Sequence, residues 1–152
     1  MKARQISVIG RRLASIAALL LAAGCTLIEG PEPVNPLLGT WTNADNDQVT
    51  LKPDAVIVTP NKGAAAAMGP ADCNGVFTLA YGRMATAPFA VLFPAQPDLE
   101  AKLKEALVQP EYPVAEVTCG QGGTTYLMVG EREVLAIYRD AGIGGLEHLT
   151  RL

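Results

Sequence analysis

Short apolar runs separated by turn-forming residues characterise the chain from Leu37 onward. In residues 48–52, Val49 and Leu51 alternate with polar side chains, which is the period of a half-buried β-strand. Further strands are expected around Trp41 and at 55–59, 76–81, 89–93, 114–119, 124–129, 134–138 and 146–152. We therefore predict a mostly β fold, an antiparallel up-and-down barrel or barrel-like sandwich of about eight strands with one short helix.

The helix is predicted at residues 98–107, where the apolar period changes. Leu99, Leu103 and Leu107 fall on one helical stripe. Asp98 is expected to cap the N-terminus, and Glu100 is spaced to pair with Lys104. Because so short a helix is not stable alone, its leucines must pack on the sheet or across a barrel mouth.

The N-terminus has the layout of an export signal. Basic residues at positions 2, 4, 11 and 12 precede an apolar stretch at 13–23, which ends in small residues before Cys25. This stretch is much shorter than the roughly 20 residues that a membrane-spanning helix requires. Residues 1–24 are therefore predicted to be a signal peptide.

The run Leu-Leu-Leu-Ala-Ala-Gly-Cys at 19–25 resembles the lipobox of bacterial lipoproteins, although Ala22 stands where leucine is commoner. In that family the cysteine sulfur receives a diacylglycerol, and the new amino group is acylated, for example with palmitate. The resemblance implies lipidation at Cys25. Thr26, in place of Asp, implies sorting to the outer membrane, facing the periplasm, rather than retention in the inner membrane.

Residues 25–37 are expected to form a tether, because Pro31, Pro33 and Pro36 favour an extended backbone. A dozen such residues reach about 35 Å. Residues 38–152 are then enough for a single β-rich domain with one core.

The expected mature chain is acidic. Removing residues 1–24 takes away four basic residues and no acid, so the formal net charge of −3 becomes −7. Phosphate backbones and anionic headgroups repel such a domain. We expect no nucleic-acid partner, and a membrane attachment that depends on the acyl chains at Cys25.

The other two cysteines, Cys73 and Cys119, are predicted to form a disulfide, because an exported chain folds in an oxidising compartment. Two free buried thiols are the alternative. A metal site is not expected, because neither cysteine has a C-x-x-C partner and the chain has one histidine.

Residues suited to catalysis are few in the expected mature chain. Both serines, Ser7 and Ser15, lie in the predicted signal peptide. His148 is the only histidine, and we expect it to be a partly exposed strand residue. Neither an enzymatic activity nor a cofactor is predicted.

Two polar segments have simple interpretations. Residues 43–47 alternate oxygen-bearing side chains like a calcium loop, but Gln48 replaces the required glycine, so a solvated turn is predicted. Residues 120–123 are glycine-rich but lack the lysine and the helix of a phosphate loop, so a hairpin connection is predicted.

Gly39-Thr40-Trp41 resembles the G-x-W motif in the first strand of lipocalins and related calycin barrels, where the tryptophan closes one end. Small protease-inhibitor lipoproteins have a similar motif at the start of their domain. In lipocalins an arginine near the last strand packs on the tryptophan, and either Arg139 or Arg151 could do so. The alternative is that Trp41 is an ordinary core aromatic.

The sequence thus favours a lipid-anchored, non-enzymatic module that binds an envelope protein, as an inhibitor or an assembly accessory. A lipocalin-like carrier of a small apolar ligand is the alternative. In the carrier, the predicted helix would act as a lid. The residues expected to bind its ligand are Trp41, Phe77, Leu79, Phe89, Val91, Leu103 and Tyr126.

Overall fold

The computed structural model of the chain describes residues 34–88, 93, 95–140 and 143–152. The predicted signal peptide, Cys25 and most of the tether lie outside this part. The same is true of Phe89 and Val91, so the strand predicted at 89–93 is not described, and Phe93 itself is not in a strand.

In the described residues, nine strands form one antiparallel sheet in the order β4-β3-β2-β1-β9-β8-β7-β6-β5. This confirms the mostly β prediction, with nine strands in place of about eight. The elements are β1 (Gly39–Thr42), β2 (Gln48–Leu51), β3 (Val56–Thr59), β4 (Ala66–Ala67), β5 (Phe77–Ala85), α1 (Pro97–Ala106), β6 (Glu111–Cys119), β7 (Gly122–Gly130), β8 (Glu133–Asp140) and β9 (Ile143–Arg151).

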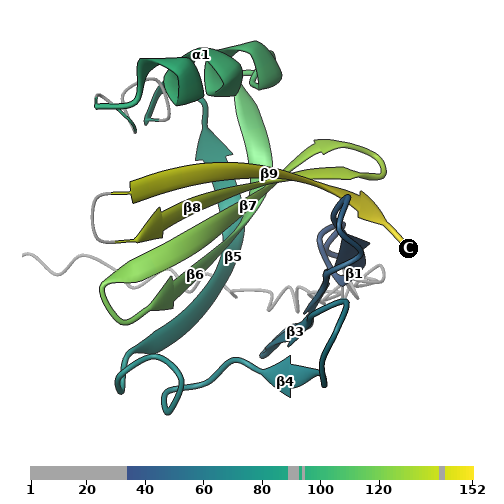
Figure 1. Cartoon of the computed structure of the whole chain (residues 1–152). Coiled ribbons are helices and arrows are strands. Elements are labelled where there is room, and N and C mark those ends of the chain that lie inside the picture. The colour runs from purple at the N-terminus through teal and green to yellow at the C-terminus, as the bar shows by residue number, and fades with distance from the viewer. Residues whose placement is uncertain (1–33, 89–92, 94, 141–142) are drawn as a thin grey trace, which may run out of the picture. The chain divides into compact units, whose positions relative to one another are not determined.

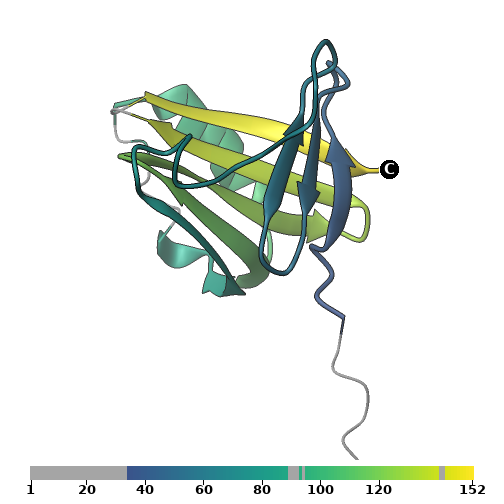
Figure 2. The same ribbon diagram turned by 90° about the horizontal axis from the view of Figure 1, so that it is seen from below.

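The sheet curls into a half-barrel with β1–β4 folded across one face of β6–β9 (Figures 1 and 2). The turn in the sheet occurs where β1 meets β9, because only Trp41–Arg151 and Thr42–Thr150 pair there. On its other side β9 pairs with β8 from Ile143 to Thr150. Strands β4 and β5 are the two edges. We call the face covered by β1–β4 the inner face.

Alternate residues of β7 and β8 point to two separate cores. Tyr126 packs on the inner face, whereas its neighbour Leu127 packs on the outer face. The same alternation separates Ala136 from Ile137 in β8. The buried residues of the inner core are Leu37, Trp41, Leu51, Val56, Ala115, Val117, Tyr126, Val134, Ala136 and Leu149.

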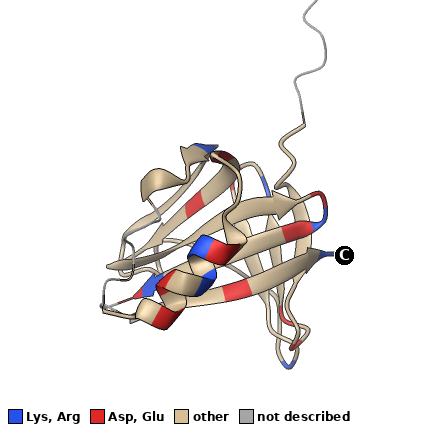
Figure 3. Ribbon diagram, turned by 90° about the horizontal axis from the view of Figure 1, so that it is seen from above, with Lys and Arg blue, Asp and Glu red and all other residues tan. Residues whose placement is uncertain are grey.

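Helix α1 covers the outer face, where Leu103 and Leu107 pack with Tyr112, Leu127 and Ile137. Sheet strands that are buried on both faces have apolar residues at successive positions, as β8 does at 134–137. Figure 3 marks the charged residues along α1, of which Asp98, Lys102, Lys104 and Glu105 are exposed and Glu100 is half-buried.

The helix differs from the prediction at its start. It begins at Pro97, and Gln96 holds the capping position without a side-chain hydrogen bond. Asp98 therefore lies in the first turn, and the prediction that it caps the helix is wrong. The predicted pair is present, with Lys104 Nζ 2.6 Å from Glu100 Oε1. Among the residues described, no helix combines the length and apolarity needed to cross a membrane.

Cys73 and Cys119 form a disulfide with their Cα atoms 4.6 Å apart, as predicted. The bond joins the segment between β4 and β5 to the end of β6, across a sequence separation of 46 residues. In the chain-entropy model, such a loop closure stabilises the fold by about 4 kcal/mol.

Residues 120–121 connect β6 and β7 as a tight hairpin, so the hairpin connection predicted at 120–123 is present but shorter, because Gly122 and Gly123 belong to β7. Gly120 has a φ of +60°, which favours glycine. A Cβ atom at Gly123 would lie 2.6 Å from the Val117 carbonyl oxygen, so this position requires glycine for a different reason, the close approach of the neighbouring strand.

Trp41 is fully buried in the inner core, and its Nε1 donates to the Leu37 carbonyl oxygen at 2.9 Å. The Arg151 guanidinium lies 4.6 Å from the centre of the indole ring. Its Nη2 also donates to the carbonyl oxygens of Pro36 and Leu38, at 2.5 and 3.0 Å. Of the two arginines considered from the sequence, Arg151 is therefore the one that packs on Trp41.

Candidate functional site

The inner face of the half-barrel contains a pocket of about 410 Å³, which we call the tyrosine pocket. It lies between β2 and β3 on one side and β7, β8 and β9 on the other. Its apolar walls are supplied by Val49, Val58, Pro60, Met68 and Leu149. Its polar lining consists of Asn43, Asp47, Gln48, Thr124, Tyr126, Tyr138 and Glu147.

Glu147 is the centre of a hydrogen-bond network in this pocket. The Tyr138 hydroxyl donates to Glu147 Oε2. The Asn43 amide donates to Glu147 Oε1 at 2.5 Å. Both partners are neutral donors, so the network holds the carboxylate in place without neutralising its charge.

A second carboxylate, Asp47, lies in the β1–β2 turn beside this network. It accepts a hydrogen bond from the Asn61 backbone N–H at 2.7 Å and another from the Asn43 amide at 3.2 Å. These two bonds lower the pKa of Asp47, the backbone bond contributing most. Asn43 thus connects both carboxylates of the pocket.

The β1–β2 turn is built by Asn43 and is the solvated turn predicted from residues 43–47. Asn43 Oδ1 accepts the backbone N–H of Asp45 at 3.0 Å and of Asp47 at 2.8 Å. Asn46 adopts a φ of 64°, a conformation that asparagine tolerates better than most residues. Across the described ranges, no three histidine, cysteine or acidic residues gather in a way that could hold a metal ion.

The two tyrosines of the pocket have raised pKa values. Burial, and then the charge of Glu147, raise the pKa of Tyr126 to about 12. Burial also raises the pKa of Tyr138, followed by its hydrogen bond to Glu147 and the charges nearby. Both phenols therefore stay protonated at neutral pH and act as neutral hydrogen-bonding groups.

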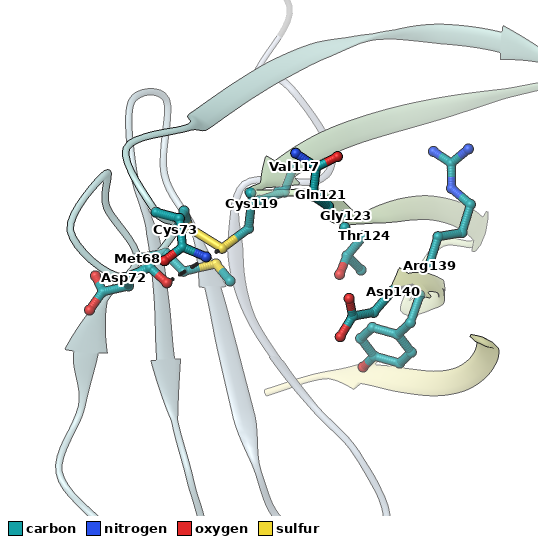
Figure 4. A pocket seen from close by; sticks show the side chains of 14 residues that line it. Met68, Asp72, Cys73, Val117, Cys119, Gln121, Gly123, Thr124, Arg139 and Asp140 are labelled. Atoms are coloured by element: carbon teal, nitrogen blue, oxygen red, sulfur yellow. Dashed lines mark hydrogen bonds between the residues drawn. A yellow bond between two sulfur atoms is a disulfide. The ribbon is translucent and has the colours of Figure 1, made fainter. Parts of the chain in front are cut away.

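A second pocket, of about 380 Å³, adjoins the first, and we call it the disulfide pocket. The two pockets share Met68, Thr124 and Tyr138 as lining residues. Figure 4 shows the Cys73–Cys119 bond on one side of the disulfide pocket, with Arg139 and Asp140 on the other.

The residues predicted to bind a ligand do not all come together. Tyr126 lines the tyrosine pocket, and Trp41, Phe77 and Leu79 pack in the same inner core. Leu103, in contrast, is buried with α1 on the opposite face of the sheet. The helix therefore does not cover the pocket, and its predicted role as a lid is not what the structure shows. Phe89 and Val91 lie outside the described residues.

Sequence reasoning missed the Tyr138–Glu147 pair. The available signal was the alternation in the last strand, because Leu149 faces the inner core and Glu147 is two residues before it. An acid at an inward strand position is unusual, since charged residues are rarely buried without a partner. His148, between them, is exposed.

Searches with the whole chain found no matching family model, no matching curated protein and no matching solved structure.

Proposed function

We propose that this chain is a bacterial lipoprotein, attached by acyl chains on Cys25 to the outer membrane and facing the periplasm, and that its domain carries a small ligand with an apolar body. The anchor rests on the lipobox-like run at 19–25. The carrier function rests on the tyrosine pocket. No catalytic step is assigned to the domain.

The shape and lining of the tyrosine pocket carry this proposal. Its volume of about 410 Å³ falls within the range of about 300–1,000 Å³ that is usual for small-molecule sites. Such sites combine apolar walls with a few fixed polar groups that orient the ligand. Here Val49, Val58 and Leu149 supply apolar wall, and the Tyr138–Glu147 pair supplies the fixed polar end.

The packing of Arg151 on Trp41 gives further support. The resemblance of residues 39–41 to the lipocalin motif implies an arginine from the last strand on the tryptophan, and Arg151 of β9 occupies that place. The likeness concerns two side chains, so it supports the architecture of a carrier and leaves the ligand open.

Native mass spectrometry of the full chain, extracted gently from membranes, tests the carrier function. We expect an added mass of a few hundred daltons that disappears on denaturation. A V58W variant, which fills the tyrosine pocket, should lose this mass, whereas V108W, at an exposed position that does not line the pocket, should keep it. A bare wild-type mass under these conditions would contradict the proposal.

The anchor needs its own test. Labelling growing cells with a fatty-acid analogue should mark the wild-type protein, and C25A should lose both the label and the membrane attachment. A variant that stays membrane-bound without the label would overturn the lipid anchor.

The edge strand β5 supports a second candidate function, the binding of an envelope protein by strand addition. Hydrogen bonds from Gly120 N to Val76 O and from Thr86 N to Pro110 O flank the β5–β6 ladder. Because bonding alternates along an antiparallel pair, the outward N–H and C=O groups belong to Phe77, Leu79, Tyr81, Arg83 and Ala85. No other described strand pairs with this nine-residue edge.

An open edge of this length invites an extended segment from another chain. Replacing Arg83 by proline removes one outward N–H group, whereas R83A removes only the Arg83–Glu111 ion pair. With a photo-crosslinking residue at position 80, we expect an envelope adduct that R83P abolishes and R83A retains. Equal adduct yields in the two variants would exclude binding through this edge.

A further inference from the structure

The charged side chains that line the tyrosine pocket have one sign, whereas the cation Arg139 lines the adjoining disulfide pocket together with Asp140. Its lining residues include two carboxylates, Asp47 and Glu147, and no lysine, arginine or histidine. The ion pairs within the described ranges, Arg83–Glu111 and Lys104–Glu100, involve neither of these two acids. The hydrogen-bond donors that contact the two carboxylates are amides and a phenol, which carry no charge.

We infer that the tyrosine pocket selects an organic cation, an amine or quaternary ammonium group on an apolar body. The inference rests on the proposed carrier function and names its class of ligand. The two acids and the two aromatic rings of Tyr126 and Tyr138 attract the cationic head. The apolar residues Val49, Val58 and Leu149 accept the body.

The raised pKa values of Tyr126 and Tyr138 are consistent with the negative charge of the pocket. The charge of Glu147 contributes to the raised pKa of both Tyr126 and Tyr138, and that of Asp47 contributes at Tyr138. Both acids therefore act on groups inside the pocket. The same field that disfavours a phenolate favours a cation and disfavours an anionic ligand such as a fatty acid.

The arrangement of the network also favours a cation over a neutral ligand. Asn43 fixes the positions of Asp47 and Glu147 together, so no reorganisation of the two acids is needed when a ligand binds. The rings of Tyr126 and Tyr138, which line the pocket, can also attract a cation, and a neutral molecule of the same shape does not receive this attraction.

Three probes with the same ring and different charge test this inference by calorimetry on the full chain in detergent: benzyltrimethylammonium, benzyl alcohol and phenylacetate. We expect the ammonium probe to bind most tightly, with an affinity that falls as the ionic strength rises. If benzyl alcohol or phenylacetate binds as tightly as the ammonium probe, the cation inference is overturned while the carrier proposal stands.

Variants provide the second arm of the test. E147Q removes one pocket charge, and we expect it to weaken binding of the ammonium probe about tenfold, which corresponds to about 1.4 kcal/mol. E131Q makes the same charge change at an exposed turn and should leave the affinity within twofold. D47N should act in the same direction as E147Q and replaces it if E147Q does not fold.

The outcomes distinguish failure of the cation inference from failure of the carrier proposal. If neither E147Q nor D47N changes the affinity for the ammonium probe, the two acids do not select the ligand and the inference fails. If none of the three probes binds and native mass spectrometry shows a bare chain, the carrier proposal fails with it.

Discussion

Tyr138 and Glu147 illustrate how single residues give the inner face its chemistry. A phenol that donates to a carboxylate inside a partly apolar pocket must stay protonated for the network to persist. The raised pKa of Tyr138 is consistent with this requirement. The residue that keeps the pocket polar is therefore also one that links the stability of the fold to pH.

Stability should fall in alkaline solution because of these tyrosines. In the unfolded chain tyrosine loses its proton near pH 10, whereas Tyr126 and Tyr138 hold theirs to higher pH in the fold. The unfolded state then binds fewer protons, so the free energy of unfolding decreases as the pH rises above 10. In urea titrations between pH 9 and 11.5, Y138F should lose stability less steeply than the wild type. Identical slopes would contradict this assignment.

Arg151 should stabilise the fold more than its position in the last strand suggests. R151K keeps the positive charge but loses the planar guanidinium that packs on Trp41. A lysine is also less suited to donate to the carbonyl oxygens of both Pro36 and Leu38. We expect a loss of about 1–2 kcal/mol in the free energy of unfolding, measured by urea denaturation. R139K, at an exposed position, is the matched control and should change stability by less than about 0.5 kcal/mol.

At the scale of elements, α1 and the strands have separate tasks. The helix seals the outer core, and the inner face of the strands forms the pocket. Stability and ligand binding should therefore be separable by mutation, because the sheet lies between the two cores.

L103A provides the test of this separation. Removing a fully buried leucine side chain should cost about 2–5 kcal/mol in the free energy of unfolding. Binding of the ammonium probe, measured where the variant is still folded, should stay within twofold of the wild type. V108A, next to the helix and 83% exposed, should leave both quantities unchanged. A large loss of affinity in L103A would show that the two faces are coupled.

Periodicity predicted the elements where it was strong. The alternation at Val49 and Leu51 predicted β2, and the spacing of Leu99, Leu103 and Leu107 predicted α1. Periodicity did not indicate β4, because two successive alanines at 66–67 show no alternation of polarity. The capping position was also missed, because Pro97 can start a helix without a side-chain cap.

The candidate site was harder to predict, because it depends on which strands face each other. Asn43 and Glu147 are 104 residues apart and meet only through the β1–β9 pairing. Likewise, the motif at Trp41 could not distinguish Arg151 from Arg139, since the choice depends on the register of the last strand. The cysteine pair was predictable, because the expected export to an oxidising compartment and the expected lipidation of Cys25 make Cys73 and Cys119 partners for each other.

At the scale of the whole molecule, the disulfide holds the curled sheet to the segment that precedes its edge strand. Reduction should lower the free energy of unfolding by about 4 kcal/mol, because the unfolded chain regains the freedom of a long loop. Urea denaturation with and without a thiol reductant measures this loss. The C73A/C119A double variant should be destabilised by a similar amount and should not respond to the reductant.

The position of β9 has a consequence for how the domain is made. It is the last of the nine strands in sequence, yet it occupies the middle of the sheet, with four strands on either side. Strands β1–β4 therefore cannot join the others until residues 143–151 have been synthesised, and their pairing closes a very long loop. Such non-local pairing makes folding slow. The complete sheet therefore closes only after the last strand has been made, and this delay suits the proposed export, because a membrane pore admits a chain that has not yet completed its fold.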